Sequence, residues 1–355
     1  MLNHLVNKFL YDCSKYNGLA EEIRTDCGDR RIVVARCTKP FQYVNLMNIP
    51  LPESSYRILC VGHSFAGSEA FVETLREHDM GTWDRILDFK RSEDIFLFFL
   101  ALKKIDFLFT EIDYGLRLAF PMREVKERGC EIGCYEEGAS MYCNGEEFVL
   151  SLCHPAVYRR PLLRAAYRTA RRLTLRLLGS GTWYGRSKWT SYIYSYYPHA
   201  PSLDDCAGKC RPFTYSLMEQ IGRLSHLFPL EREYPEIAAL RGLNVLIVAI
   251  GWNGEVKLKD DDLQKYDRII VKQHPHIVGS AKNSGSDRVL YMYGYIPTEF
   301  LASRLLRNGN RTTLRSEMSA SLLYLMGTPV DCEFYDAPPA TFKDMIAYLE
   351  REKKN

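Results

Sequence analysis

The chain has 355 residues, of which 46% are hydrophobic and 26% are charged. This length suffices for two domains, each with its own core, and the composition excludes a largely disordered chain. A formal net charge of +3 is too small to indicate nucleic-acid binding.

Eleven cysteines, odd in number and irregularly spaced, favour a reducing compartment with mostly buried free thiols. The closest groupings, Cys130/Cys134 and Cys206/Cys210, have three intervening residues and lack zinc-site spacing, so we predict no metal. Residues 1–16 lack the pattern of a signal peptide, and no apolar run reaches the ~18 residues of a membrane span. We therefore expect a cytoplasmic protein.

The first strong element is an apolar strand at 56–62, preceded by a strand candidate at 31–36. A turn at 63–68 and a helix at 69–78 follow, which is the opening unit of a Rossmann-like sheet. Within the turn, Gly62-His63-Ser64-Phe65-Ala66 resembles the nucleophile elbow of serine hydrolases, with alanine at the second glycine. Two interpretations stay open: a nucleophile at Ser64, or a turn whose amides and hydroxyls face a ligand.

A helix near 95–104, a strand at 105–109, an apolar segment at 114–120 and a polar helix at 122–128 come next. They lead to Tyr135-Glu136-Glu137-Gly138. These carboxylates could be a solvated turn. Alternatively, one carboxylate is a general base, the other fixes its geometry, and the glycine lets substrate approach the backbone.

Residues 148–203 contain no acidic residue and nine basic ones, which requires an anionic partner or a solvent-facing stripe. A helix is predicted near 159–178. The arginines at four-residue steps along it are Arg160, Arg164, Arg168, Arg172 and Arg176, opposite Leu162, Ala166, Leu173 and Leu177. With the aromatic residues that follow, Trp183, Tyr184, Trp189 and four tyrosines at 192–197, this pattern is typical of an interface binder for anionic lipid. A domain-linking helix and a site for a polyanionic glycan are the alternatives.

The second half begins after a predicted linker at 198–212 and a helix at 213–228. A strong strand at 243–250 runs into a glycine-rich loop that contains Asn253, as a second Rossmann-like sheet would. The next strand, 266–271, ends at Lys272-Gln273-His274-Pro275-His276. Ligands bind at the carboxyl ends of such strands, so this stretch is a candidate site.

Further along lie an apolar strand at 289–293, the segment Ile296-Pro297-Thr298-Glu299-Phe300-Leu301, and Ser316, Ser319 and Ser321 before a helix at 322–326. These serines either cap the helix or bind phosphate. We expect an α/β protein with two Rossmann-like domains facing across a cleft. Their predicted extents are 1–200 and 213–340, with a closing helix at 341–355.

The order of four short motifs resembles the GT-B glycosyltransferases that use CMP-activated sugars, namely bacterial sialyltransferases and polysialyltransferases. The motifs are Tyr135-Glu136-Glu137-Gly138, His274-Pro275, Ile296-Pro297-Thr298-Glu299, and Ser319 with Ser321. The resemblance implies CMP-sialic acid as donor, with no cofactor and no metal.

The resemblance also implies roles for single residues. Glu136 would be the catalytic base, His274 would contact the departing phosphate and Glu299 the ribose. The paired hydroxyls would bind phosphate, although the family's serines are adjacent, whereas here Ala320 separates Ser319 from Ser321. Ser316 is a further candidate for that role, and Lys272 or His276 for that of the histidine. The remaining expected substrate-binding residues are Glu137, Gly138, Asn253 and Pro275.

The expected function is therefore inverting transfer of sialic acid from CMP-sialic acid to a hydroxyl of a cell-surface glycan, a lipooligosaccharide or capsular polysaccharide. The expected location is the cytoplasm, or the inner face of the cell membrane through the basic helix. A CMP-Kdo-dependent transferase, a serine hydrolase using Ser64 and a membrane-surface binding module are the alternatives. If the protein is a transferase, we expect Glu136 and His274 to face each other across the cleft.

Overall fold

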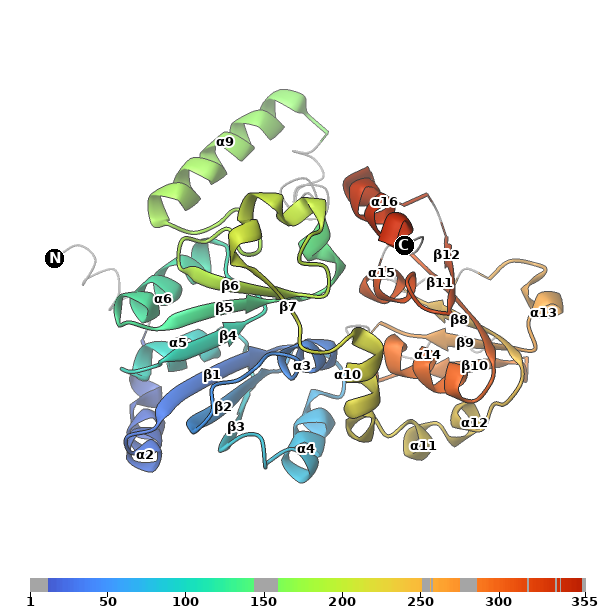
Figure 1. The fold of residues 1–355 in the computed structure, drawn as a ribbon, viewed down its shortest axis with the longest axis horizontal. Helices are drawn as coiled ribbons and strands as arrows, with labels where there is room; N and C mark the ends of the chain where they lie inside the picture. Colours follow the sequence, from blue (N-terminus) through green and yellow to red (C-terminus); the bar gives the residue numbers. More distant parts are fainter. Residues whose placement is uncertain are drawn as a thin grey trace.

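The computed structural model describes residues 12–143, 159–250, 256, 258–274, 286–317, 319–335, 337–338 and 340–352. Two parallel β-sheets, one in each half of the chain, form its framework (Figure 1). The first sheet has seven strands in the order β3-β2-β1-β4-β5-β6-β7, and the second has five in the order β10-β9-β8-β11-β12.

The elements of the first half are η1 (Ser14–Tyr16), α2 (Asn17–Cys27), β1 (Arg31–Cys37), α3 (Pro40–Leu46), β2 (Ser55–Gly62), α4 (Ser68–His78), β3 (Arg85–Phe89), α5 (Asp94–Ala101), β4 (Phe107–Thr110), α6 (Leu116–Glu127), β5 (Glu131–Tyr135), η2 (Ala139–Tyr142), α9 (Pro161–Leu178), β6 (Thr190–Ser195), η3 (Pro201–Lys209) and β7 (Cys210–Pro212). Those of the second half are α10 (Leu217–Arg223), η4 (Ser225–Leu227), α11 (Leu230–Glu233), α12 (Pro235–Ala238), β8 (Asn244–Ala249), α13 (Asp262–Lys265), β9 (Arg268–Lys272), β10 (Val289–Met292), α14 (Thr298–Arg307), β11 (Arg311–Ser316), α15 (Ala320–Leu325), β12 (Asp331–Phe334), η5 (Ala340–Phe342) and α16 (Lys343–Glu352).

Both sheets are doubly wound, and in each the strand order reverses next to the first strand of that half. The reversal lies between β1 and β4 in the first sheet and between β8 and β11 in the second. The central strands are buried on both faces, which is why their sequences are nearly continuous apolar runs. The predicted α/β class with two Rossmann-like sheets is confirmed.

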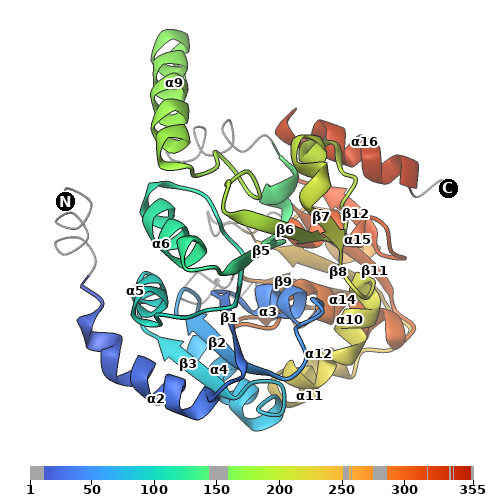
Figure 2. The same cartoon turned by 60° about the vertical axis from the view of Figure 1, so that its left-hand side comes forward.

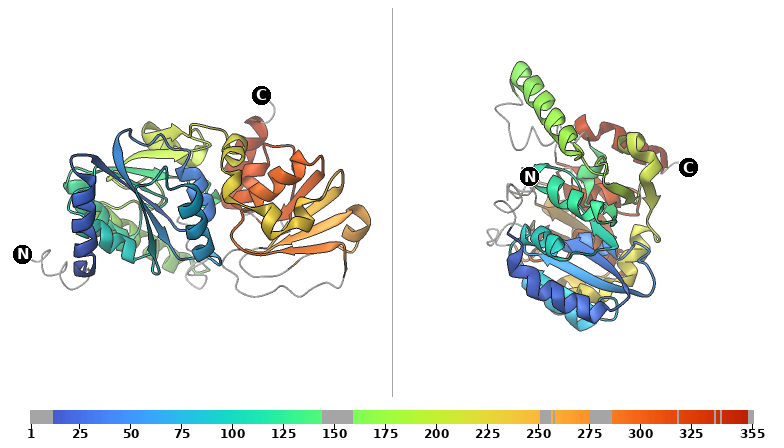
Figure 3. Two further views of the ribbon diagram at one scale, coloured as in Figure 1. Left: turned by 90° about the horizontal axis from the view of Figure 1, so that it is seen from below. Right: turned by 90° about the vertical axis from the view of Figure 1, so that its left-hand side faces the viewer.

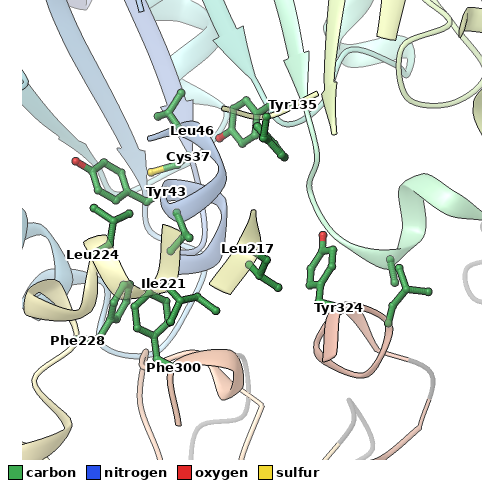
Figure 4. Close-up of a cluster of buried hydrophobic side chains, with 14 of the residues drawn as sticks. Cys37, Tyr43, Leu46, Tyr135, Leu217, Ile221, Leu224, Phe228, Phe300 and Tyr324 are labelled. Carbon is green, nitrogen blue, oxygen red and sulfur yellow. The ribbon is translucent and has the colours of Figure 1, made fainter. Parts of the chain in front are cut away.

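The two halves share one hydrophobic core rather than being joined only by a linker. Figure 4 shows how α10 contributes Leu217, Ile221 and Leu224 between α3 and the side chain of Phe300 from α14. The ring of Phe300 lies 4.1 Å, centroid to centroid, from that of Phe228. Because this contact is apolar and buried, it holds the carboxyl ends of the two sheets near each other.

Two local predictions are wrong. The segments 114–120 and 122–128 were expected as separate elements, but residues 116–127 form the single helix α6, which contains Pro121. Its buried residues Leu118, Met122 and Val125 follow helical spacing across the proline. Residues 198–212, expected as a linker, form η3 and β7, and β7 pairs with β6. Proline is acceptable at the end of β7 because this is an edge strand.

The aromatic residues after the basic helix are also placed differently from the prediction. Trp183, Tyr184 and Trp189, expected at a membrane interface, are buried in the protein core. The helix that precedes them, α9, stands away from the body of the molecule (Figures 2 and 3). At the other end of the chain, α16 packs against η3, with the rings of Tyr348 and Tyr197 6.3 Å apart.

Candidate active site

Glu136 directly follows β5, and its side chain is fully buried. Its backbone N–H continues the sheet by donating to the carbonyl oxygen of Tyr194, at 2.9 Å. Carboxylate atom Oε2 accepts hydrogen bonds from the Tyr142 hydroxyl and from the backbone N–H of Tyr196, the latter at 2.8 Å. The other oxygen, Oε1, is buried without a hydrogen-bond partner. This oxygen has the capacity to accept a proton from an incoming hydroxyl group.

Burial raises the pKa of Glu136 to about 7. The hydrogen bonds from Tyr142 and the Tyr196 backbone, together with the neighbouring Tyr324 hydroxyl, act in the opposite direction and keep the pKa from rising further. A carboxyl group that titrates near neutrality suits a general base, because it is ionised at working pH and still basic enough to hold a proton.

The raised pKa predicts a pH-dependent stability effect of Glu136→Gln. In the unfolded chain this group titrates near 4.5, so ionised Glu136 above pH 7 destabilises the fold by about 3 kcal/mol. This destabilisation disappears as the pH falls from 7 through 4.5. Urea unfolding should therefore show Glu136→Gln more stable than wild type at about pH 8 and equal to it at about pH 4. Glu131→Gln, at the exposed start of β5, is the control and should show no such difference.

The adjacent carboxylate, Glu137, has the opposite electrostatic environment. Lys39, which follows β1, forms an ion pair with it. Ser140 and Tyr184 donate hydrogen bonds to its Oε2, the former at 2.9 Å. Burial alone would raise the pKa of Glu137, but Lys39 and these hydroxyls outweigh it and lower the pKa to about 2. Glu137 is therefore permanently ionised, whereas its neighbour Glu136 exchanges a proton near neutrality.

The second half of the chain reaches Glu136 through α15. Tyr324 of this helix lies beside the Glu136 carboxylate, and its ring stacks on Phe41 at 5.1 Å. Gly138 has a φ of +151°, and a Cβ atom there would lie 3.3 Å from that of Ala320. Glycine at this position thus allows α15 to approach the β5 loop closely. The candidate base lies at the junction of the two sheets.

The start of the same helix carries the predicted serines. Ser319 is the N-cap residue, and its Oγ accepts the backbone N–H of Leu322 at 3.2 Å. Ser321 hydrogen-bonds Glu299 of α14, whose pKa is raised by burial. Lys272, the last residue of β9, lies close enough to Glu299 to interact with its charge. Helix α15 therefore connects Glu136 with Ser319, Ser321 and Glu299.

Lys272 is buried, and this burial lowers its pKa to about 8. Its ammonium donates to the carbonyl oxygens of Gln273 and Gly294, at 3.0 and 3.1 Å. His274 follows two residues later, half-buried, at the carboxyl edge of the second sheet. Ser316 is the buried last residue of β11. Asn253, Pro275 and His276 lie outside the described residues.

Ser64 is placed differently from an activated nucleophile. Its hydroxyl donates to the backbone carbonyl of Thr38, at 2.5 Å. The neighbouring His63 pairs through Nε2 with Asp88. The arrangement matches a turn whose serine is fixed by the backbone: the hydroxyl donates to a carbonyl oxygen, whereas in a triad it donates to an imidazole.

Sequence reasoning missed the tyrosines that surround the base. Tyr142 and Tyr324 were unremarkable apolar positions, and Tyr196 had been assigned to a membrane-facing aromatic group. Lys39 carried no signal because its partner, Glu137, is 98 residues away. The one available clue was the period-two alternation of tyrosines at 192–196, which is typical of a strand leading into the site.

Within the described ranges, no group of three or more His, Cys, Asp or Glu side chains could hold a metal ion. The cysteines there, including Cys206 and Cys210, are free thiols. No helix in the same part of the chain has the length and apolarity needed to cross a bilayer.

No protein-family model and no curated protein matches the chain. Solved structures similar to it include the following two. The wall teichoic acid polymerase TagF is 13% identical, with a TM-score of 0.49, over 98% of this chain and 79% of that one. The glycotransferase of kitacinnamycin is 11% identical, with a TM-score of 0.46, over 92% of each chain. Similarity at this level carries no information on activity or substrate.

Proposed function

We propose that the protein is an inverting, metal-independent glycosyltransferase that moves sialic acid from CMP-sialic acid to a hydroxyl of a cell-surface glycan. The acceptor would be a lipooligosaccharide or a capsular polysaccharide. One observation carries the proposal: Glu136 presents an unpartnered carboxylate oxygen at the junction of the two sheets, with its pKa raised to about 7.

In the proposed reaction, the acceptor hydroxyl donates its proton to Oε1 of Glu136 while its oxygen attacks the anomeric carbon of the donor. The bond from that carbon to the phosphate oxygen breaks, and CMP leaves with the electron pair. Glu137, held ionised by Lys39, keeps negative charge beside the oxocarbenium-like transition state. Because Glu136 is fully buried beside Tyr324, acceptor binding requires α15 to move away from the β5 loop.

The leaving-group side of the proposed site is the carboxyl edge of the second sheet. His274 would stabilise the departing phosphate by a charge-assisted hydrogen bond. Lys272, whose pKa of about 8 leaves it mostly cationic at neutral pH, adds positive charge near the same strand end. Glu299 would bind the ribose, and Ser319 and Ser321 the phosphate.

The test is incubation of purified protein with CMP-sialic acid and a galactosyl or sialyl acceptor, with release of CMP and extension of the acceptor as readouts. CMP-Kdo is offered in parallel, because it has the same leaving group. We expect turnover with CMP-sialic acid in the presence of a chelator, loss of turnover in Glu136→Ala and His274→Ala, and full turnover in Ser64→Ala. Turnover that survives the first two substitutions and is lost in the third would contradict the proposal.

A further inference from the structure

Helix α9 is amphipathic, but its arginine face is more buried than its apolar face. A surface helix normally turns its apolar stripe toward the core. Here the more buried stripe contains half-buried arginines, Arg164, Arg168 and Arg171, with Leu175 as the buried residue of the helix. Arg171 donates to the backbone carbonyl of Thr182, at 3.1 Å, which fastens this face to the protein.

The opposite stripe of α9 is apolar and exposed. It consists of Leu162, Ala166, Ala170, Leu173 and Leu177, spaced three or four residues apart. The three leucines are 86%, 58% and 79% exposed. Of the seven large hydrophobic side chains exposed in the described part of the chain, five belong to this helix. Figures 1 to 3 show α9 standing out from the molecule, and the exposed fractions show that this stripe is open to solvent.

The positive charge on α9 indicates which kind of partner covers its apolar stripe. Residues 159–178 contain seven arginines and no acidic residue. Arg172 and Arg176 are exposed, and Arg176 lies three residues after Leu173, which puts it beside the apolar stripe, with Arg172 one turn before it. A second copy of α9 would bring arginine against arginine with no acidic partner on the helix. Anionic headgroups beside an apolar layer supply both the negative charge and the apolar contact.

We propose that α9 docks the protein on an anionic lipid surface, with Leu162, Leu173 and Leu177 inserted among the acyl chains and Arg172 and Arg176 at the headgroups. Helices of this kind lie in the plane of the interface, and they bind through buried apolar area and headgroup charge together. The helix begins at Pro161 and ends at Leu178, before Gly179, whose φ is +72°, so it is a bounded element.

The test is co-sedimentation of the full chain with phosphatidylcholine vesicles, with and without phosphatidylglycerol. We expect the wild type to bind the anionic vesicles and to be released by salt. Leu173→Ser/Leu177→Ser should weaken this binding by about tenfold or more, because it removes the inserting side chains. Arg172→Gln/Arg176→Gln should weaken binding to anionic vesicles by about tenfold or more and leave the weak binding to neutral vesicles unchanged. Leu263→Ser, an exposed leucine on α13, is the matched control.

Circular dichroism and urea unfolding establish that each variant is folded, and the substituted side chains are exposed in this structure. Sedimentation equilibrium without lipid separates the other occupants of the stripe. A dimer that Leu173→Ser/Leu177→Ser dissociates would overturn the lipid proposal in favour of a second copy. Failure of the wild type to bind anionic vesicles, or unchanged binding of the leucine variant, would also overturn it. Vesicle binding needs neither donor nor acceptor, so its outcome is independent of transferase activity.

Discussion

Glu136→Gln is expected to lower kcat by about three orders of magnitude. Glutamine keeps the shape of the side chain and still accepts hydrogen bonds from Tyr142 and the Tyr196 backbone. It cannot take the proton of the acceptor hydroxyl. If donor and acceptor bind through other residues, KM should change far less than kcat.

The pH dependence of the same reaction identifies the base. The free enzyme carries Glu136 with a pKa of about 7, and only its ionised form accepts a proton. We therefore expect kcat/KM of the wild type to rise with pH up to about 7, and to fall again above about pH 8, where Lys272 loses its charge. This acid limb should be absent from the residual rate of Glu136→Gln and intact in the exposed control Glu131→Gln. A Glu136→Gln variant with wild-type kcat would exclude this residue as the base.

Arg315→Met is expected to destabilise the fold by about 3–5 kcal/mol, because it leaves a buried carboxylate without its counter-charge. Arg315 is a buried residue of β11. Its Nη1 donates to Oδ2 of the equally buried Asp262, at 2.6 Å, and its Nε donates to Oε2 of Glu333, at 2.9 Å. Burial would lower the pKa of the guanidinium, but the two carboxylates raise it, so the arginine stays charged.

Urea unfolding of three variants distinguishes a buried network from a surface ion pair. Arg311→Met removes an exposed pair with Asp331 on the same two strands, and it should change the midpoint little. The double variant Arg315→Met/Asp262→Leu should recover part of the lost stability, because it removes the uncompensated carboxylate. Equal midpoints for Arg315→Met and Arg311→Met would show that the network contributes no more than a surface pair.

Much of the framework is predictable because parallel strands covered on both faces need continuous apolar segments. The runs at 56–62, 243–250 and 266–271 therefore identified β2, β8 and β9 within a few residues. The predicted boundaries and linkers between elements were wrong more often. Separate elements were expected on either side of residue 121, although α6 continues through Pro121, and a linker was expected at 198–212, where β7 completes the sheet. In each case burial of the flanking apolar residues outweighed the local preference.

The candidate site, too, was predictable from the sequence only in part. Adjacent carboxylates before a glycine, at the end of an apolar segment, already indicated Glu136 and Glu137. Nothing in the sequence distinguished their protonation, because that depends on Lys39 for one and on burial beside Tyr142 and Tyr324 for the other. These partners come from distant segments, and only packing brings them within hydrogen-bonding distance.

Sequence alone determined that residues 159–178 form an amphipathic basic helix, since arginine and leucine spacing follows the helical period. Only the tertiary structure decided which face of α9 contacts the protein. Arg164, Arg168 and Arg171 are half-buried, whereas Arg172, Arg176 and the leucine stripe are exposed. Periodicity defines two faces of a helix but carries no information on which neighbour each one meets. That choice is made by the elements that pack beside the helix, and they are remote in the chain.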